Sequence, residues 1–280
     1  DVTTRWRGGS GGTCGARNNC PRNACSALRG SSQGFWPSSV SVPAVGGRAQ
    51  ASTCNSVVLP ALQSLGLYNA DALVLSHADA DHDGAAASLL RQFRFRQIWT
   101  GQGKAYPHWA THDCRGEAWQ WDGVWFEWLT LPRNEVAPTT NAQSCVLRVV
   151  TQGQAVLIPA DTGKEEETAL LQQYGEQLHS TVLLLGHHGS SGSNSSAWLN
   201  AVAPKLAIAS SGFRNSYHHP TAAVQMRLRA HGIDLYRTDT QGSVVLLLDE
   251  NLTLLPHAGT RFWWQRKPLA ALDQVGFTAK

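Results

Sequence analysis

The sequence predicts an α/β fold with a functional site at the ends of its strands. Apolar runs of about five to seven residues, the length of buried strands, alternate with longer segments that have helical spacing. Three of the runs, 71–75, 155–158 and 181–186, lead directly into clusters of His and Asp. Because loops at strand ends hold functional side chains on a rigid base, we expect these clusters to form one site.

The expected elements follow this pattern along the chain. The predicted strands, which are apolar runs bounded by turn residues, span residues 73–75, 97–100, 124–130, 145–150, 155–158, 182–185, 206–209 and 244–248. The predicted helices span residues 57–65, 85–93, 165–174, 196–202 and 222–230, the third with an acidic first turn that suits a helix N-terminus. Four tryptophans, between residues 119 and 128, alternate in a way that indicates a packed hairpin, with stacking on nucleic-acid bases as the alternative.

The segment 76–84 carries the strongest chemical signal. It places His77, Asp79, Asp81 and His82 within six residues, on a loop between a strand and a helix. Two imidazoles and two carboxylates suit two divalent cations about 3.5–4 Å apart. Carboxylate-rich sites favour manganese, and mixed nitrogen and oxygen ligands also suit zinc. A polar loop in which Asp81 or Asp83 caps a helix is the simpler alternative, but it does not account for the four residues together.

Later strand ends supply further candidates. Asp161 follows the run 155–158 and is a candidate bridging ligand. His187 and His188 follow the next apolar run, and we expect one of the pair to bind metal. We assign His187 as that ligand and His188 to the substrate, and the residues alone leave the reverse open. Ser190 opens a loop rich in hydroxyl side chains, which either contacts substrate phosphates or only caps the helix at Ser195 or Ser196.

These segments together resemble the metallo-β-lactamase superfamily, and more closely the C-terminal domain of the ComEC family of DNA-uptake channel proteins of natural competence. The resemblance lies in the order and spacing of several motifs over about residues 55–265: the loop Ser76–Gly84, the strand-end Asp161, His187-His188-Gly189-Ser190 and Tyr217-His218-His219-Pro220. It implies an αββα sandwich. It also implies a substrate-phosphate contact or proton donor at His219, with His218 as a second substrate contact, and Asp81 and His219 as the catalytic residues.

One departure from the superfamily pattern is informative. Many members place His where this chain has Asp79, and supply another His where it has Asn141. The first metal site is therefore expected to be rich in oxygen ligands, which makes hydrolysis of β-lactams or small esters a less favoured function.

The chain is expected to divide into three parts: a leader at residues 1–55, the metallo-β-lactamase-like domain at 56–262, and a basic, aromatic tail at 263–280. The leader is rich in Gly, Ser, Arg and Cys and lacks the first strands that the resemblance implies. We interpret it as disordered or as a frame-altered replacement of those strands. The formal net charge of +3 also resides there, since residues 1–50 hold six Arg and one Asp, so the basic balance does not by itself indicate DNA binding.

Two further expectations concern the surroundings of the domain. Cys145 lies in an apolar run and is expected to be a buried strand residue, whereas Cys114 is a candidate for a disulfide in an oxidising compartment. No apolar run approaches the roughly 18 residues that cross a bilayer, so the chain as written is expected to be soluble.

The resemblance implies a metal-dependent phosphodiesterase that hydrolyses DNA with a metal-bound hydroxide and two divalent ions, manganese or zinc. The expected partners are DNA, the membrane channel portion of the same protein family and other competence proteins. The full-length protein is expected in the bacterial inner membrane, with this domain on the periplasmic or extracellular face. A non-catalytic domain that guides DNA or associates with the channel is the alternative.

Overall fold

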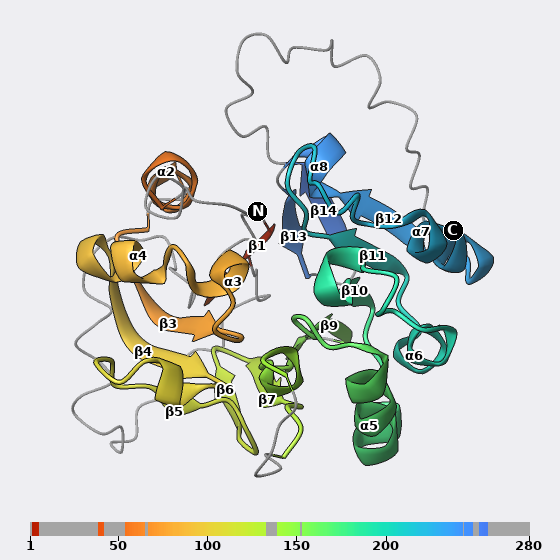
Figure 1. The fold of residues 1–280 in the computed structure, drawn as a ribbon, viewed down its shortest axis with the longest axis horizontal. Helices are drawn as coiled ribbons and strands as arrows, with labels where there is room; N and C mark the ends of the chain where they lie inside the picture. Colours follow the sequence, from red (N-terminus) through yellow and green to blue (C-terminus); the bar gives the residue numbers. More distant parts are fainter. Residues whose placement is uncertain are drawn as a thin grey trace, which may run out of the picture.

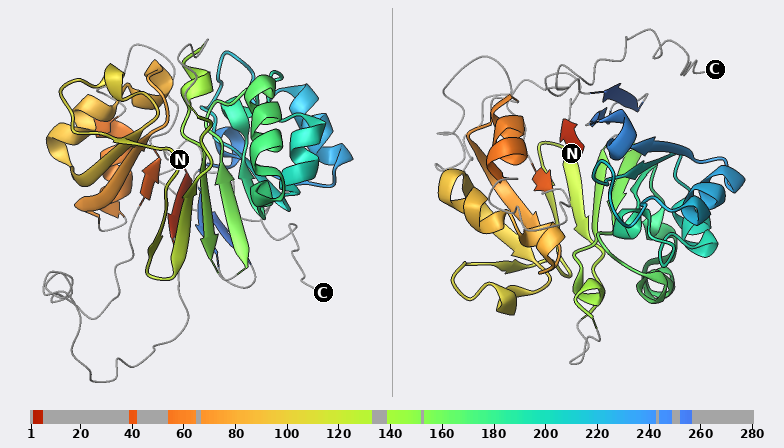
Figure 2. Two further views of the ribbon diagram at one scale, coloured as in Figure 1. Left: turned by 90° about the horizontal axis from the view of Figure 1, so that it is seen from below. Right: turned by 45° about the horizontal axis from the view of Figure 1, so that its top comes forward.

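The fold is a sandwich of sheets between two layers of helices, as expected (Figures 1 and 2). The computed structural model describes residues 2–5, 39–41, 54–64, 67–132, 139–151, 153–242, 244–248 and 252–256. Within these ranges, no helix combines the length and the apolar character that a membrane span requires. The expected C-terminal tail and most of the expected leader lie outside the described residues.

Three sheets form the inner layers. The seven-stranded sheet has the order β12-β11-β10-β9-β8-β7-β6, and its strands β9 to β12 run parallel. In chain order these strands are β6 (Ala118–Trp121), β7 (Val124–Trp128), β8 (Leu147–Thr151), β9 (Gln154–Ile158), β10 (Val182–Leu184), β11 (Leu206–Ala209) and β12 (Asp234–Arg237). The four-stranded parallel sheet contains β2 (Ser39–Ser41), β3 (Asn69–Leu75), β4 (Arg94–Thr100) and β5 (His112–Asp113). The small third sheet contains β1 (Val2–Arg5), β13 (Val244–Leu247) and β14 (Thr253–Pro256).

Helices cover the outer face of each large sheet (Figure 1). The four-stranded sheet carries a π-helical turn at Cys54–Val58, α2 (Leu59–Ser64), α3 (Ala80–Asp83) and α4 (Ala86–Gln92). The seven-stranded sheet carries α5 (Lys164–Tyr174), α6 (Ser196–Val202) and α7 (Ala222–Ala230), and α8 (Thr238–Gln241) follows β12. The observed bounds of α6, α7 and β11 are those predicted.

The alternation of apolar side chains along the strands explains the layering. In β10, Val182 packs into the core that the sheets share, whereas Leu183 packs into the core under α6 and α7. In β3, Ala72 likewise belongs to the shared core, and Leu73 and Leu75 face the helices of their own sheet. Since successive side chains of a strand point to opposite faces, a run that is apolar throughout is buried on both sides.

The tryptophan-rich hairpin packs inward, as expected. Trp119 in β6 is partly buried, pairs with Phe126 in the antiparallel register of β7, and stacks on Trp99 of the facing sheet with ring centroids 5.5 Å apart. Trp128 is buried in the same cluster, whereas Trp125 on the opposite face of β7 is partly exposed. The inward tryptophans are therefore core residues and not surfaces for stacking bases.

Several elements differ from the prediction. Residues 2–5 and 39–41 of the expected leader form strands, paired in parallel with β13 and β3. The edge strand β12 was not predicted, because Asp234–Arg237 is short and half polar. The loop 76–84 contains the one-turn helix α3, whose N-cap is Asp79, so neither Asp81 nor Asp83 is the capping residue.

A disulfide joins the two large sheets near the site. Cys114 follows β5, Cys145 precedes β8, and their sulfurs are bonded. Cys145 is buried as expected, but it is half of a disulfide and not a free strand thiol. Its backbone N–H donates to the carbonyl of Ser76 over 3.0 Å, which attaches the cross-link to the end of β3.

The disulfide should stabilise the fold measurably. The Cys114→Ser/Cys145→Ser double variant should lose about 2–4 kcal/mol of unfolding free energy, because the reduced chain gains freedom on unfolding. Urea unfolding in metal-free buffer, with and without dithiothreitol, measures this loss. Reductant should destabilise the wild type and leave the double variant unchanged; a wild type insensitive to reductant would contradict the assignment.

Candidate metal centre

The site lies where strand ends of the two large sheets meet. The carboxyl end of β3 leads into His77, Asp79 and α3, and the carboxyl end of β9 leads to Asp161. The tight turn Gly186–Gly189 follows β10, and the loop 210–221 follows β11. Because β9, β10 and β11 are parallel neighbours, their carboxyl ends share one edge of the sheet. Ligand-type residues far apart in the sequence thereby reach one place.

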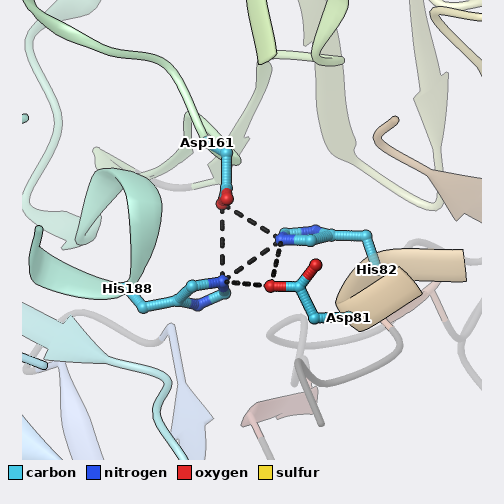
Figure 3. A group of neighbouring side chains, drawn as sticks. All are labelled: Asp81, His82, Asp161 and His188. Carbon is cyan, nitrogen blue, oxygen red and sulfur yellow. Dashed lines mark hydrogen bonds and ion pairs between the residues drawn. The ribbon is translucent and has the colours of Figure 1, made fainter. Parts of the chain in front are cut away.

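Four side chains form the centre of the site (Figure 3). Asp81, His82, Asp161 and His188 each offer one atom, and these atoms lie within 4.8 Å of one another. His82 Nε2 is 3.1 Å and His188 Nε2 is 3.6 Å from Asp161 Oδ1. Asp81 Oδ2 is 3.5 Å from His188 Nε2. We call Asp81, His82 and His188 the His82 set.

A second group of side chains faces the other oxygen of Asp161. His77 Nε2 lies 3.9 Å and His187 Nε2 lies 3.6 Å from Asp161 Oδ2. His77 Nε2 is also 3.5 Å from Asp79 Oδ2. We call His77, Asp79 and His187 the His77 set. The single carboxylate of Asp161 thus lies between two sets, with one oxygen toward each.

The nitrogen and oxygen atoms of the site suit a divalent transition metal. His77 is fully buried, and among the described residues its Nε2 has no hydrogen-bond partner. Burial of an unpartnered polar nitrogen is costly unless another ligand satisfies it. A cation held between this imidazole and the adjacent carboxylates would do so, so the residues present fit a bound metal.

Second-layer contacts orient the imidazoles. Ser76 Oγ lies 3.1 Å from His77 Nδ1 and 3.0 Å from His82 Nδ1. A hydroxyl oxygen accepts two hydrogen bonds, so both rings can carry their proton on Nδ1 and turn the lone pair of Nε2 toward the carboxylates. His188 Nδ1 donates to the carbonyl of Ser210 over 2.9 Å, which assigns the same tautomer to the neutral ring.

The electrostatics favour ionised carboxylates in the site. Burial alone would raise the pKa of Asp161, but His82, when protonated, donates a hydrogen bond to it, and the charges of His82, His188 and His187 in their imidazolium forms hold the pKa well below its usual range. The hydrogen bond that a protonated His188 ring donates lowers the pKa of Asp81. Burial and the nearby His82 lower the pKa of His77 to about 4. The site therefore offers charged oxygens and a neutral His77 nitrogen, both of which are ready to bind a cation.

The turn that carries His187 and His188 is held by residues that the sequence did not reveal. Both histidines have positive φ, 50° and 55°. Asn194 Oδ1 accepts from Gly186 N over 3.0 Å and Asn194 Nδ2 donates to Gly186 O over 2.9 Å, which closes the turn. The buried Glu167 of α5 accepts from the N–H of Ser195 over 2.9 Å and from that of Asn194.

Arg227 of α7 holds the same loop from its other side. Its guanidinium donates to the carbonyl of Ser193 over 2.8 Å and to that of Asn194. Ser195 accepts from Trp198 N as the N-cap of α6, which confirms the capping alternative for this serine. The loop 190–196 is thus a fixed support. Glu167 and Arg227 lie in the predicted helices 165–174 and 222–230, but the sequence pattern does not reveal these contacts.

The structure brings most of the predicted site residues together, with one difference. His188, expected to contact substrate, lies with the ligand atoms of the His82 set, and His187, expected as the ligand, faces Asp161 Oδ2. The positive-φ turn directs the two neighbouring rings to different oxygens. The centroid of the His219 ring lies 6.0 Å from that of His187 and 6.5 Å from that of His188.

The remaining predicted substrate contacts lie at the margin of the site. Ser190 is half-buried, and its Oγ accepts from Gly192 N over 3.3 Å. His218 is exposed. Substrate contact by these two residues stays a prediction.

Comparison with known proteins identifies the family. The family model described as "Metallo-beta-lactamase superfamily" matches residues 44–212. The chain belongs to the metallo-β-lactamase superfamily. Within this superfamily it is 44% identical over 212 residues to Competence protein ComA of Neisseria gonorrhoeae, a match that covers 75% of this chain and 30% of that protein.

Two further relatives agree. The chain is 32% identical to Recombination protein 2 of Haemophilus influenzae, over 75% of this chain and 26% of the relative. It is 31% identical to ComE operon protein 3 of Bacillus subtilis, over 67% of this chain and 26% of the relative. The predicted resemblance to the ComEC family is therefore confirmed. The chain spans less than a third of the length of each of these three relatives.

Ser76 should tune the metal affinity of this superfamily member. Ser76→Ala should weaken Mn²⁺ binding by about 10- to 100-fold, because His82 loses its Nδ1 partner and His77 keeps only the contact with Ser144 Oγ, 3.4 Å away. Isothermal titration calorimetry measures the affinity, with the exposed Ser191→Ala as the matched control. Equal affinities for wild type and Ser76→Ala would show that the hydroxyl does not orient the rings.

Glu167 should stabilise the folded chain. Glu167→Gln should lower the unfolding free energy by about 1–3 kcal/mol. The two carboxylate oxygens accept from two backbone N–H groups, and the amide NH₂ that replaces one of them cannot accept. Urea unfolding measures the loss, and Glu165→Gln, exposed in the same helical turn, is the control. A loss of equal size in both variants would refute the specific contact.

The difference in stability between wild type and Glu167→Gln should depend on pH. Burial raises the pKa of Glu167, against the opposing hydrogen bonds from Ser195 and Asn194 and the charge of Arg227. A pKa that is higher in the folded state contributes stability at low pH that is lost as pH rises through it. The advantage of wild type over Glu167→Gln should therefore be larger at about pH 4 than at about pH 7.

Proposed function

We propose that this chain is a metal-dependent phosphodiesterase that cleaves DNA, and that Asp161, with the His77 set and the His82 set, would hold the divalent cations. The observation that carries the proposal is the division of its carboxylate between the His77 set and the His82 set, with Oδ2 toward one and Oδ1 toward the other. Divalent cations held by these residues would polarise a phosphoryl group and neutralise the charge that develops during displacement at phosphorus.

The chemistry of the ligands supports a phosphodiester substrate. The His77 set pairs its imidazoles with the carboxylates of Asp79 and Asp161, and oxygen-rich sites favour harder ions such as manganese. One relative is named a competence protein and another a recombination protein, and DNA is the polymer that is taken up in natural competence and exchanged in recombination. We therefore propose DNA as the substrate, and zinc as the second candidate metal.

The residues of the chain divide the work as follows. When bound, divalent ions supply Lewis acidity toward the phosphoryl oxygens. Asp81, Asp161 and the imidazoles hold the charge of the site fixed before the substrate arrives, so little reorganisation is needed. His219 is the proposed proton donor or phosphate contact beside the ligands, because its ring lies next to those of His187 and His188. Burial, together with those two histidines, lowers the pKa of His219, so at neutral pH its neutral ring can donate one N–H hydrogen bond, which favours the phosphate contact over proton donation.

The disulfide bears on where the reaction takes place. A Cys114–Cys145 bond forms and persists in an oxidising compartment. We propose that the domain works on the periplasmic or extracellular face of the bacterial inner membrane. There it would act beside the membrane channel portion of its own protein family and other competence proteins.

Substitution of the carboxylates of Asp161 and Asp81 tests the proposal. Asp161→Asn and Asp81→Asn should each lower cleavage of labelled single- or double-stranded DNA in Mn²⁺ by more than about 100-fold, because each removes a charged ligand. Loss of a residue that only contacts a ligand typically costs about 10- to 100-fold. The assay is repeated with Zn²⁺ and Mg²⁺. Asp122→Asn, in the exposed turn between β6 and β7, is the matched control.

Two outcomes would reject the nuclease. The first is equal cleavage by Asp161→Asn and wild type. The second is no cleavage by wild type with any of the three metals, which together with metal-independent DNA binding would favour the non-catalytic guiding role. A chromogenic lactam in the same assay separates phosphodiester from lactam hydrolysis.

A further inference from the structure

The loop between β11 and α7 exposes aromatic rings beside the metal centre. Tyr217 is 74% exposed and Phe213 is 68% exposed, although both side chains are large and apolar. The loop starts at Ser210, whose carbonyl accepts from His188, and ends at Thr221, before α7. Its rings are therefore attached to the edge where the ligands gather.

A column of three rings leads from the ligand cluster to solvent. The rings of His188 and His219 are stacked, with centroids 6.5 Å apart and planes inclined by 25°. Those of His219 and Tyr217 are also stacked, 5.7 Å apart and again inclined by 25°. His188 is the member that belongs to the His82 set, and Tyr217 is the exposed outer member. The Tyr217 ring is thus exposed to solvent at the outer end of a stack whose inner end is His188 of the metal centre.

Hydrogen bonds within the loop fix the backbone of His219, the residue on whose ring Tyr217 stacks. The side chain of Asn215 accepts from His219 N over 2.7 Å and donates to His219 O over 2.8 Å. Thr221 N donates to Gly189 O over 3.0 Å, which joins the loop to the turn of His187 and His188. A ring that is both exposed and fixed loses little freedom when a second planar group stacks on it.

We propose that Tyr217 is a stacking platform for a nucleobase next to the phosphate at the metal centre. The inference rests on the proposed function and adds a preference for unpaired strands, because a base in a duplex is already stacked on its neighbours. The guanidinium of Arg214, 5.3 Å from the centroid of the Phe213 ring, adds a cation on the same loop that a nucleic-acid backbone can approach. The charge of the chain outside the first 50 residues is slightly negative, so local stacking carries weight that a basic surface would otherwise supply.

Binding to strands with and without bases tests the platform. Two fluorescein-labelled oligonucleotides of about 12 residues are used, one of thymidine and one with abasic sites throughout, in a buffer that chelates metal. Tyr217→Ala should weaken binding of the thymidine strand about tenfold and leave the abasic strand unchanged, since one base–aromatic stack has about that value. Tyr217→Phe should bind like wild type. Tyr68→Ala, 72% exposed at the opposite end of β3 from the ligands, is the matched control and should also bind like wild type.

Three outcomes would overturn the platform. These are an equal loss on both strands, no loss on either strand, and a wild type that does not distinguish the strands. Cleavage in Mn²⁺ is measured separately, and there Tyr217→Ala should raise KM and leave kcat nearly unchanged. If wild type cleaves nothing but the base-dependent loss persists, the nuclease proposal fails and the platform stands; if cleavage occurs with an unaltered KM in Tyr217→Ala, the reverse holds.

Discussion

The two large sheets meet at the carboxylate of Asp161, and the other side chains of the site are arranged around this carboxylate. It stands at the end of β9, while the His77 and Asp79 side chains arrive from β3 in the facing sheet. The shared core between the sheets brings these ends together. The Cys114–Cys145 disulfide cross-links the sheets, and the N–H of Cys145 donates a hydrogen bond to the carbonyl of Ser76 at the end of β3. The packing of apolar faces thus sets the distances between polar groups. On their own, these groups would pay a free-energy cost for losing their hydration.

Around this carboxylate, the structure controls protons before any ion is considered. Ser76 and the carbonyl of Ser210 occupy the Nδ1 atoms of the imidazoles, so the Nε2 atoms face inward. Glu167, Asn194 and Arg227 in turn fix the backbone that carries His188. Each layer limits the freedom of the layer inside it, which is how a site built on turns becomes as rigid as one built on strands.

The sequence alone was sufficient where function and local pattern coincide. The strand-to-helix loop of His77, Asp79, Asp81 and His82, and Asp161 at a strand end, could be found because ligand residues follow apolar runs. The choice between His187 and His188 could not, because it depends on φ angles that adjacent identical residues do not reveal. Glu167 reads as one acid of a helical first turn, and its buried contacts exist only when α6 and its preceding loop pack on α5. The partner of Cys114 required the three-dimensional contact of two sheets.

The assignment of ligands to both large sheets has a thermodynamic consequence. An ion bound by His77 and Asp161 together would join β3 to β9, which the shared core and the disulfide also hold together. Such an ion binds the folded chain and not the unfolded one, so its chemical potential becomes a term in the stability of the domain. In a compartment poor in that metal the two halves of the sandwich would separate more readily, and catalytic competence and resistance to proteolysis would rise and fall together.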